Sequence, residues 1–127
     1  EVLRRFCKMV QDYKQLKIWK RGFELAVKIY KLTNKFPKHE RYNLTSQLRR
    51  AATSISSNIA EGASKHTTRD FRRFLYQAYG SLKEVESLLL LSKELSYVLV
   101  RDFKEMSKEI DEIARMIYRF IEAVKEK

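Results

Sequence analysis

The chain has 127 residues, of which 44% are apolar and 34% are charged, as expected for one globular domain. Three Gly and one Pro are few for the many turns of a sandwich or barrel, so the composition argues against an all-β fold. A single cysteine rules out an internal disulfide and, with only two histidines, a dense nitrogen and sulfur metal site.

The net charge of +11 lies almost entirely in the first half of the chain. Residues 1–66 hold 15 basic and 5 acidic side chains, a net of +10, whereas residues 67–127 hold 12 and 11, a net of +1. A one-sided positive field attracts polyanions, which include nucleic acid, an anionic membrane and an acidic protein. The alternative is a solvated basic surface without such a partner.

Four stretches carry apolar residues at helical spacing, separated by short polar breaks. The first runs from about Leu16 to Phe36, where Pro37 ends it because proline cannot continue the helix and disfavours helix at the preceding residue. The second runs from Leu44 to Gly62, with the glycine placed to terminate the helix.

The third stretch begins at Thr67 or Thr68, either of which would cap a helix N-terminus. Asp70 would lie in its first turn, and the stretch ends near Leu95. The fourth begins close to Asp102 and alternates apolar spacings of three and four, the pattern of a bundle seam.

Four long helices joined by short connections would lie antiparallel to their neighbours. The sequence therefore predicts one domain, an all-α, up-down-up-down four-helix bundle over residues 15–127. Residues 1–14 form a separate N-terminal extension. A short amphipathic helix in this extension is suggested by the spacing of Leu3, Phe6, Val10 and Tyr13. With no signal-peptide pattern and no apolar run of membrane-spanning length, the expected location is the cytoplasm. Because residue 1 is not Met, it is not expected to be the natural start.

Basic side chains on the first predicted helix, Lys35 included, lie opposite its apolar stripe in a ridge that only Glu24 interrupts. Such a ridge could follow a phosphate backbone, and arginine clusters on the next two helices offer guanidinium forks suited to phosphate or carboxylate. The candidate nucleic-acid-binding residues are Lys17, Lys20, Arg21, Lys28, Lys31, Arg49, Arg50, Arg69, Arg72 and Arg73. The alternatives are an ordinary solvated helix face and, for the third-helix arginines, inter-helix salt bridges with Asp70 or Glu61.

The segment from Asn58 to Gly62 is interpreted as structural or as part of an interface. Asn58 and Glu61 could hydrogen-bond to a loop or to another subunit, whereas one carboxylate without a neighbouring histidine forms no acid–base pair. The sequence has no Gly-rich phosphate loop, nucleophile elbow or paired-histidine metal motif. We therefore predict no catalytic residue, metal or cofactor, and a protein that is not an enzyme.

Five segments carry a family resemblance: residues 16–19, 29–37, 44–52, 57–62 and 80–84. They resemble the bacterial four-helix-bundle family encoded within intervening sequences of large-subunit ribosomal RNA genes, which includes the accessory variability determinant (Avd) of diversity-generating retroelements. The similarity extends from about Tyr13 to the C-terminus, with Ser56 where members usually carry proline. The resemblance implies a homopentameric barrel and, for the retroelement members, binding to a reverse transcriptase and to RNA or DNA.

Together these features predict a basic bundle that binds RNA or DNA with little sequence preference, as the accessory partner of a reverse transcriptase if it belongs to the retroelement branch. The alternative is a protein-interaction module of the rRNA intervening-sequence type that docks an acidic protein and binds no nucleic acid. No membrane partner is expected. Apolar residues beyond one bundle seam are expected to face other subunits, among them Ile18, Leu25, Tyr76, Leu88 and Leu91.

Overall fold

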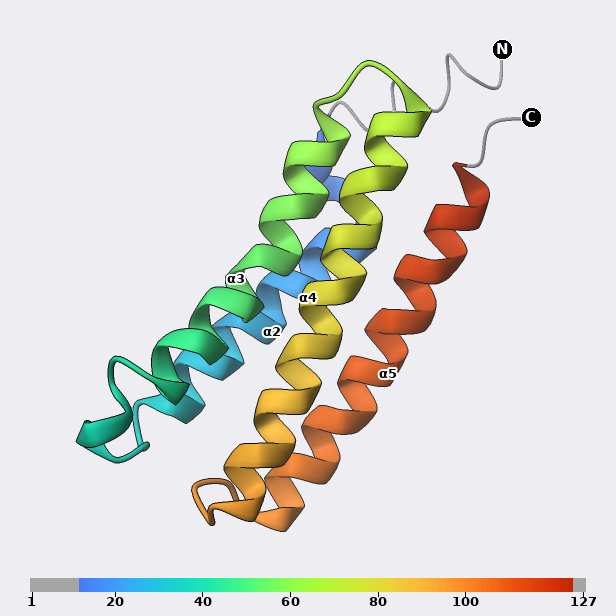
Figure 1. Cartoon of the computed structure of the whole chain (residues 1–127). Coiled ribbons are helices and arrows are strands. Elements are labelled where there is room, and N and C mark those ends of the chain that lie inside the picture. Colours follow the sequence, from blue (N-terminus) through green and yellow to red (C-terminus); the bar gives the residue numbers. More distant parts are fainter. Residues whose placement is uncertain (1–11, 125–127) are drawn as a thin grey trace.

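The computed structural model describes residues 12–124. Within this range all regular secondary structure is helical, with no strand: η1 (Tyr13–Gln15), α2 (Lys17–Thr33), η2 (Lys38–Glu40), α3 (Leu44–Ala63), α4 (Thr68–Glu94) and α5 (Val100–Ala123). Consecutive α-helices run in opposite directions (Figure 1) and pack around one apolar core. The all-α prediction is thus confirmed. The helix suggested for the N-terminal extension falls largely on residues 1–11, which lie outside the described residues.

The helix ends follow the sequence signals with two differences. Thr67 caps α4 as predicted, because its side-chain oxygen accepts a hydrogen bond from the backbone N–H of Asp70 at 3.1 Å. α2 ends at Thr33, three residues earlier than predicted, because the chain tightens into a turn that buries Phe36 before Pro37. Gly62 does not terminate α3: it lies inside the helix and has no positive φ.

Two glycines allow α3 to lie close to its neighbours. A Cβ added at Gly62 would lie 2.7 Å from Cβ of Phe74 and 2.9 Å from Cδ1 of Phe71, both on α4. A Cβ added at Gly22 on α2 would lie 3.0 Å from Cγ2 of Ile55. Gly62 therefore needs a residue without a side chain, and a side chain at Gly22 would require Ile55 to shift; both are packing requirements and not conformational ones.

The core draws on all four α-helices. Its fully buried aliphatic side chains include Leu25, Ile29, Leu48, Ile55, Ile59, Leu75, Leu82, Leu89, Ile110, Ile113 and Ile117. The expectation that Ile18 and Leu25 face other subunits is wrong, because the broad apolar face of α2 is covered by α3 and α5. Leu88 is half-buried, whereas Tyr76 and Leu91 remain about half exposed, at 51% and 48%.

Tyr97 joins the α2–α3 and α4–α5 connections, which meet at the same end of the bundle. Its hydroxyl donates to Oε2 of Glu40 at 3.0 Å and lies 3.3 Å from Nε2 of His39. The hydrogen bond to the Glu40 carboxylate raises the pKa of Tyr97, because it favours the protonated phenol. The ring also packs against Phe36, with centroids 5.4 Å apart. The chain reaches this position through a left-handed turn at Ser96, where φ is 65°.

Replacing Gly62 with alanine should destabilise the bundle by about 1–3 kcal/mol, because the new methyl group would overpack against α4. Gly80 is the matched control: it is exposed on α4, and nothing lies within 4 Å of an added Cβ. Gly80→Ala should stabilise the protein by about 0.5–1 kcal/mol through helix propensity. Urea unfolding followed by circular dichroism measures both effects. Equal effects would contradict the packing role of Gly62.

Candidate functional site

The ten candidate cations do not form one continuous surface. At the upper end of the bundle in Figure 1, where α2 and α4 begin, are Lys17, Lys20, Arg69, Arg72 and Arg73. Near the opposite end, where α2 finishes and α3 begins, are Lys31, Arg49 and Arg50. The remaining two, Arg21 and Lys28, lie between these ends on α2.

Arg21 and Lys28 face α5 and pair with its acidic side chains. Nη2 of Arg21 lies 3.0 Å from Oε2 of Glu112, and Nζ of Lys28 lies 2.6 Å from Oε1 of Glu109. Partly exposed ion pairs of this kind contribute only about 0–1 kcal/mol of stability. They nevertheless cancel positive charge in the middle of α2, so the continuous ridge expected on this helix is interrupted by α5.

The arginines at the start of α4 make separate contacts. Nη2 of Arg73 lies 3.8 Å from Oδ1 of Asp70, one turn earlier in the same helix. Nε of Arg72 donates to the backbone carbonyl of Ile121 on α5 at 3.4 Å. Arg69 is exposed and forms no ion pair within residues 12–124. The inter-helix salt bridges considered for this cluster are therefore not seen there. Arg73 pairs with an aspartate of its own helix, and Arg72 bonds to a backbone carbonyl of α5 and not to a carboxylate.

Arg49 is held against the end of α2. Its Nε donates to Oγ1 of Thr33 at 2.8 Å, and its Nη2 donates to Oδ1 of Asn34 at 2.9 Å and to the carbonyl of Tyr30 at 3.3 Å. The guanidinium carbon also lies 4.6 Å from the centre of the Tyr30 ring. The Tyr30 carbonyl also accepts from the N–H of Asn34 at 3.2 Å, so Arg49 adds a further donor there and places a cation at the negative end of the α2 dipole. Arg49 is thus a structural link between α2 and α3.

The segment ending at Gly62 acts mainly through packing. Nδ2 of Asn58 donates to the carbonyl of Ser54 in the same helix at 2.7 Å, so its amide does not reach a loop as expected. The Ser54 hydroxyl in turn donates to Oγ of Ser81 on α4 at 2.5 Å. Glu61 is exposed and forms no ion pair with the described residues. The close contact of Gly62 with α4 is the segment's clearest structural role.

A denser group of cations lies where α2 ends and α3 begins. Between residues 25 and 60 the chain has seven basic side chains and one acidic side chain, Glu40. Lys28 is neutralised by Glu109. The other six, termed the cationic end, are Lys31, Lys35, Lys38, Arg41, Arg49 and Arg50. None of these six forms an ion pair with an acidic group in the part of the chain that the structure describes. Lys38 and Arg41 were not among the candidates, although the local charge bias could have identified them.

An open cavity of about 450 Å³ lies within the cationic end. It lies beside the last residues of α2, the connection and the first turns of α3. Its polar lining consists of Thr33, Asn34, Lys38, Arg41, Thr45 and Arg49. Three cations and two hydroxyl groups therefore border one hollow.

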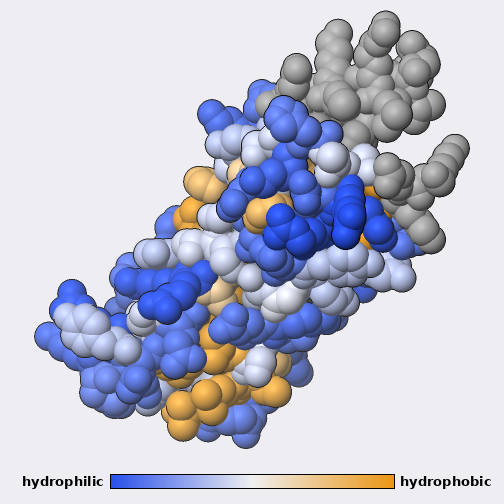
Figure 2. Space-filling view, turned by 45° about the horizontal axis from the view of Figure 1, so that its top comes forward, coloured by the Kyte–Doolittle hydropathy of each residue, from blue (hydrophilic) through white to orange (hydrophobic). Residues whose placement is uncertain are grey.

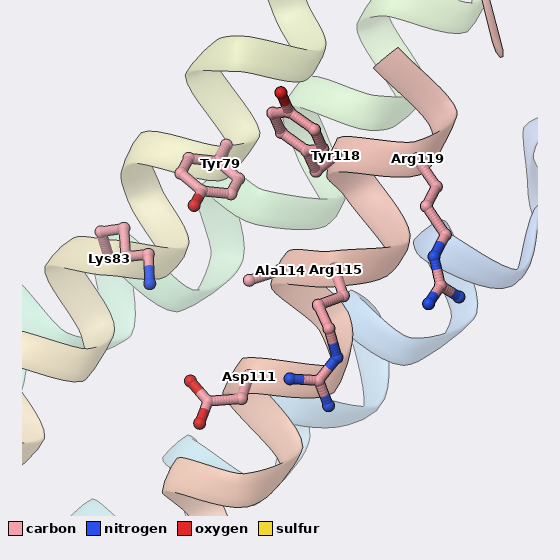
Figure 3. A pocket seen from close by; sticks show the side chains of 7 residues that line it. All are labelled: Tyr79, Lys83, Asp111, Ala114, Arg115, Tyr118 and Arg119. Carbon is pink, nitrogen blue, oxygen red and sulfur yellow. The ribbon is translucent and has the colours of Figure 1, made fainter. Parts of the chain in front are cut away.

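A smaller cavity of about 290 Å³ lies between α4 and α5 (Figure 3). Tyr79 and Lys83 border it from α4, and Asp111 and Arg115 border it from α5. Its one carboxylate has no histidine beside it, so the lining offers no acid–base pair. Among residues 12–124 no group of three or more His, Cys, Asp or Glu side chains is placed to hold a metal ion. No helix in that range combines the length and apolar character needed to span a membrane.

Arg49→Lys should destabilise the protein by about 1–2 kcal/mol, because an ammonium group cannot reproduce the planar set of bonds to Thr33, Asn34 and Tyr30. The neighbouring Arg50 is exposed, and Arg50→Lys should change stability by less than about 0.5 kcal/mol. Urea unfolding of the two variants provides the comparison. Small, equal effects would show that Arg49 does not link the two helices.

Comparison with known proteins places the fold in a family. Residues 14–119 match the family described as 23S rRNA-intervening sequence protein. A similar solved structure is a protein with unknown function from the S23 ribosomal protein family of Bacteroides thetaiotaomicron, 24% identical with a TM-score of 0.74 over 82% of this chain and 97% of that chain. This likeness shows the fold alone, and no curated protein matches. The relation to Avd stays a prediction. Since the family match covers most of its length, the chain belongs to the 23S rRNA-intervening sequence protein family.

Proposed function

We propose that this chain is a non-enzymatic protein that binds RNA or DNA through phosphate contacts, with little sequence preference. The observation that supports this function is the cationic end, whose six basic side chains have no acidic partner among residues 12–124. Unpaired cations keep their attraction for phosphates, and their binding releases counterions. Contacts to phosphates carry no base information, so lysine and arginine alone favour a weak sequence preference.

The other candidate cations would contribute less to this binding. Lys17, Lys20 and Arg69 are exposed but lie at the opposite end of the bundle. Arg21 and Lys28 could contact phosphate only by giving up their glutamate partners on α5. The cationic end is therefore the proposed primary binding surface, with the upper end as a weaker second one.

Titration of labelled RNA and DNA at several salt concentrations tests the function. The triple variant Lys31→Gln, Lys35→Gln and Arg50→Gln should bind all sequences more weakly, by about the same factor. The slope of log K against log salt should fall by about 0.7 for each phosphate of a single strand that the variant no longer neutralises. The matched control, Lys17→Gln with Lys20→Gln and Arg69→Gln, removes the same charge at the opposite end. The affinity of this control for RNA and DNA should fall less than that of the variant at the cationic end.

Absent or salt-independent binding by the unaltered protein would contradict nucleic-acid binding. Equal reductions in affinity for the two triple variants would contradict the assignment to the cationic end, because they would indicate a general field effect. Stability of each variant is checked by thermal unfolding, since the substituted side chains are exposed.

A homopentamer is also part of this proposal, and it is supported by exposed apolar side chains. Where α4 connects to α5, the exposed apolar residues include Leu90, Leu91, Leu95, Leu99 and Val100, at 45–63% exposure. Figure 2 shows hydrophobic surface gathered at the lower end of the molecule. Exposed apolar patches often mark sites of association. Repeating a weak cationic end around a ring would raise its avidity for a polyanion.

Sedimentation equilibrium should give five times the chain mass of 15.2 kDa. Leu95→Glu combined with Leu99→Glu should lower the assembled mass, because the charges would have to be buried between subunits. Gln77→Glu, an exposed polar position on α4, should leave it unchanged. A monomer for the unaltered protein would contradict the pentamer.

The second candidate function is docking of a protein partner. An acidic protein would be attracted by the same cations, and the exposed leucines near the α4–α5 connection favour a protein contact because interface cores are apolar. A reverse transcriptase is the partner proposed from the resemblance to Avd. Retention of a protein from nuclease-treated lysate, combined with no affinity for RNA or DNA, would favour docking over nucleic-acid binding.

A further inference from the structure

The guanidinium of Arg49, which lines the cavity at the cationic end, is held in place by contacts within the protein. Nε and Nη2 of Arg49 are held by Thr33 and Asn34, as described above. Its Nη1 makes no hydrogen bond to oxygen among the described residues, so its N–H groups are available. Lys38 and Arg41 line the same cavity from the connection. A preorganised cation loses little side-chain freedom on binding, and charge-assisted bonds to anions are stronger than neutral ones.

Thr45 supplies an unused hydroxyl to this cavity. The residue is only 5% exposed and lines the hollow. Its hydroxyl has no hydrogen-bond partner in residues 12–124. No fully enclosed side-chain polar atom in that range lacks a partner, so the Thr45 oxygen is reached by solvent, and the residue that carries it lines the cavity. A nearly buried hydroxyl in this position can donate to an anion inside it.

The first turn of α3 borders the same cavity through Thr45. Its N-cap residue, Asn43, makes no side-chain hydrogen bond to the helix, so the first backbone N–H groups are not capped by it. The Glu40 carboxylate does not line the cavity; it accepts hydrogen bonds from the Tyr97 hydroxyl at 3.0 Å and from the N–H of Leu44 at 3.4 Å. Cations, a hydroxyl and a helix N-terminus therefore combine around the cavity.

We propose that this cavity binds a terminal phosphate, the monoester at the end of a nucleic-acid strand. A monoester carries a charge of about −1.5 to −2 near neutral pH and has three free oxygens, whereas a backbone diester carries one charge and has two. Three cations and the Thr45 hydroxyl suit the monoester better. The source of the phosphate rests on the function proposed above, while the site itself rests on the cavity.

Two probes test the site in the full chain. The first is inorganic phosphate, titrated by calorimetry. The second is a single-stranded oligonucleotide carrying either a 5′-phosphate or a 5′-hydroxyl, with binding measured by fluorescence anisotropy. The protein should bind phosphate and should prefer the 5′-phosphorylated strand severalfold, because only that strand brings a monoester to the cavity.

Thr45→Val keeps the shape of the side chain and removes its hydroxyl. It should weaken phosphate binding about tenfold, the effect typical of removing one hydrogen bond to a charged acceptor, and reduce the preference for the 5′-phosphate. Thr53→Val is the matched control on α3, since the Thr53 hydroxyl bonds to the carbonyl of Arg50 in its own helix. Arg41→Gln, in the exposed connection, provides a second variant that leaves the core intact and should also weaken binding.

The outcomes separate the site from the function. Phosphate binding that falls in Thr45→Val and Arg41→Gln but not in Thr53→Val supports the site, even if neither strand binds and the proposed function fails. Equal affinity for the two strands overturns the strand-end assignment while leaving general nucleic-acid binding intact. No phosphate binding, or binding that neither cavity variant changes, overturns the site.

Discussion

Gly22 and Gly62 determine where α3 can lie, because a side chain at either position would meet a facing helix. α3 is therefore placed between α2 and α4 with backbones close together, and the rest of the bundle is arranged around it. Ser56 is buried at the contact with Gly22, whose added Cβ would lie 3.6 Å from the Ser56 nitrogen. Serine retains an N–H that a proline at this position would remove, and α3 runs unbroken from Leu44 to Ala63. Because the helices pack closely in the middle of the bundle, long basic side chains lie on its outer faces and at its ends.

The distribution of charge within the fold differs from its distribution along the sequence. The acidic residues of the second half are not confined to a separate surface, because α5 brings Glu109 and Glu112 alongside α2. Positive charge is thereby reduced in the middle of α2 and retained where α2 meets α3. Arg49 shows that a basic side chain can also be structural, since its bonds to α2 position both helices. Net charge alone does not distinguish these roles.

The sequence predicted the helices well because their signals are local: apolar spacing, the cap at Thr67 and the stop before Pro37 all lie within a few residues of the features they determine. The site was predicted only in part. The partners of Arg21 and Lys28 lie on α5, far along the chain, and no local pattern pairs them. Gly62 resembles a helix terminator in sequence, and only the neighbouring helix shows its packing role. The cavity likewise requires residues from α2, the connection and α3 to converge.

Tyr97 couples the movement of the α2–α3 connection to that of the α4–α5 connection. Its ring packs on Phe36 and its hydroxyl bonds to Glu40 in η2, while its backbone belongs to the loop that leads to the exposed leucines. A displacement of η2 must either break that bond or carry the loop along. The α2–α3 connection, which borders the cavity, and the α4–α5 connection, which presents apolar surface, are consequently not independent hinges. The contacts of the Tyr97 side chain limit how far either can move without the other.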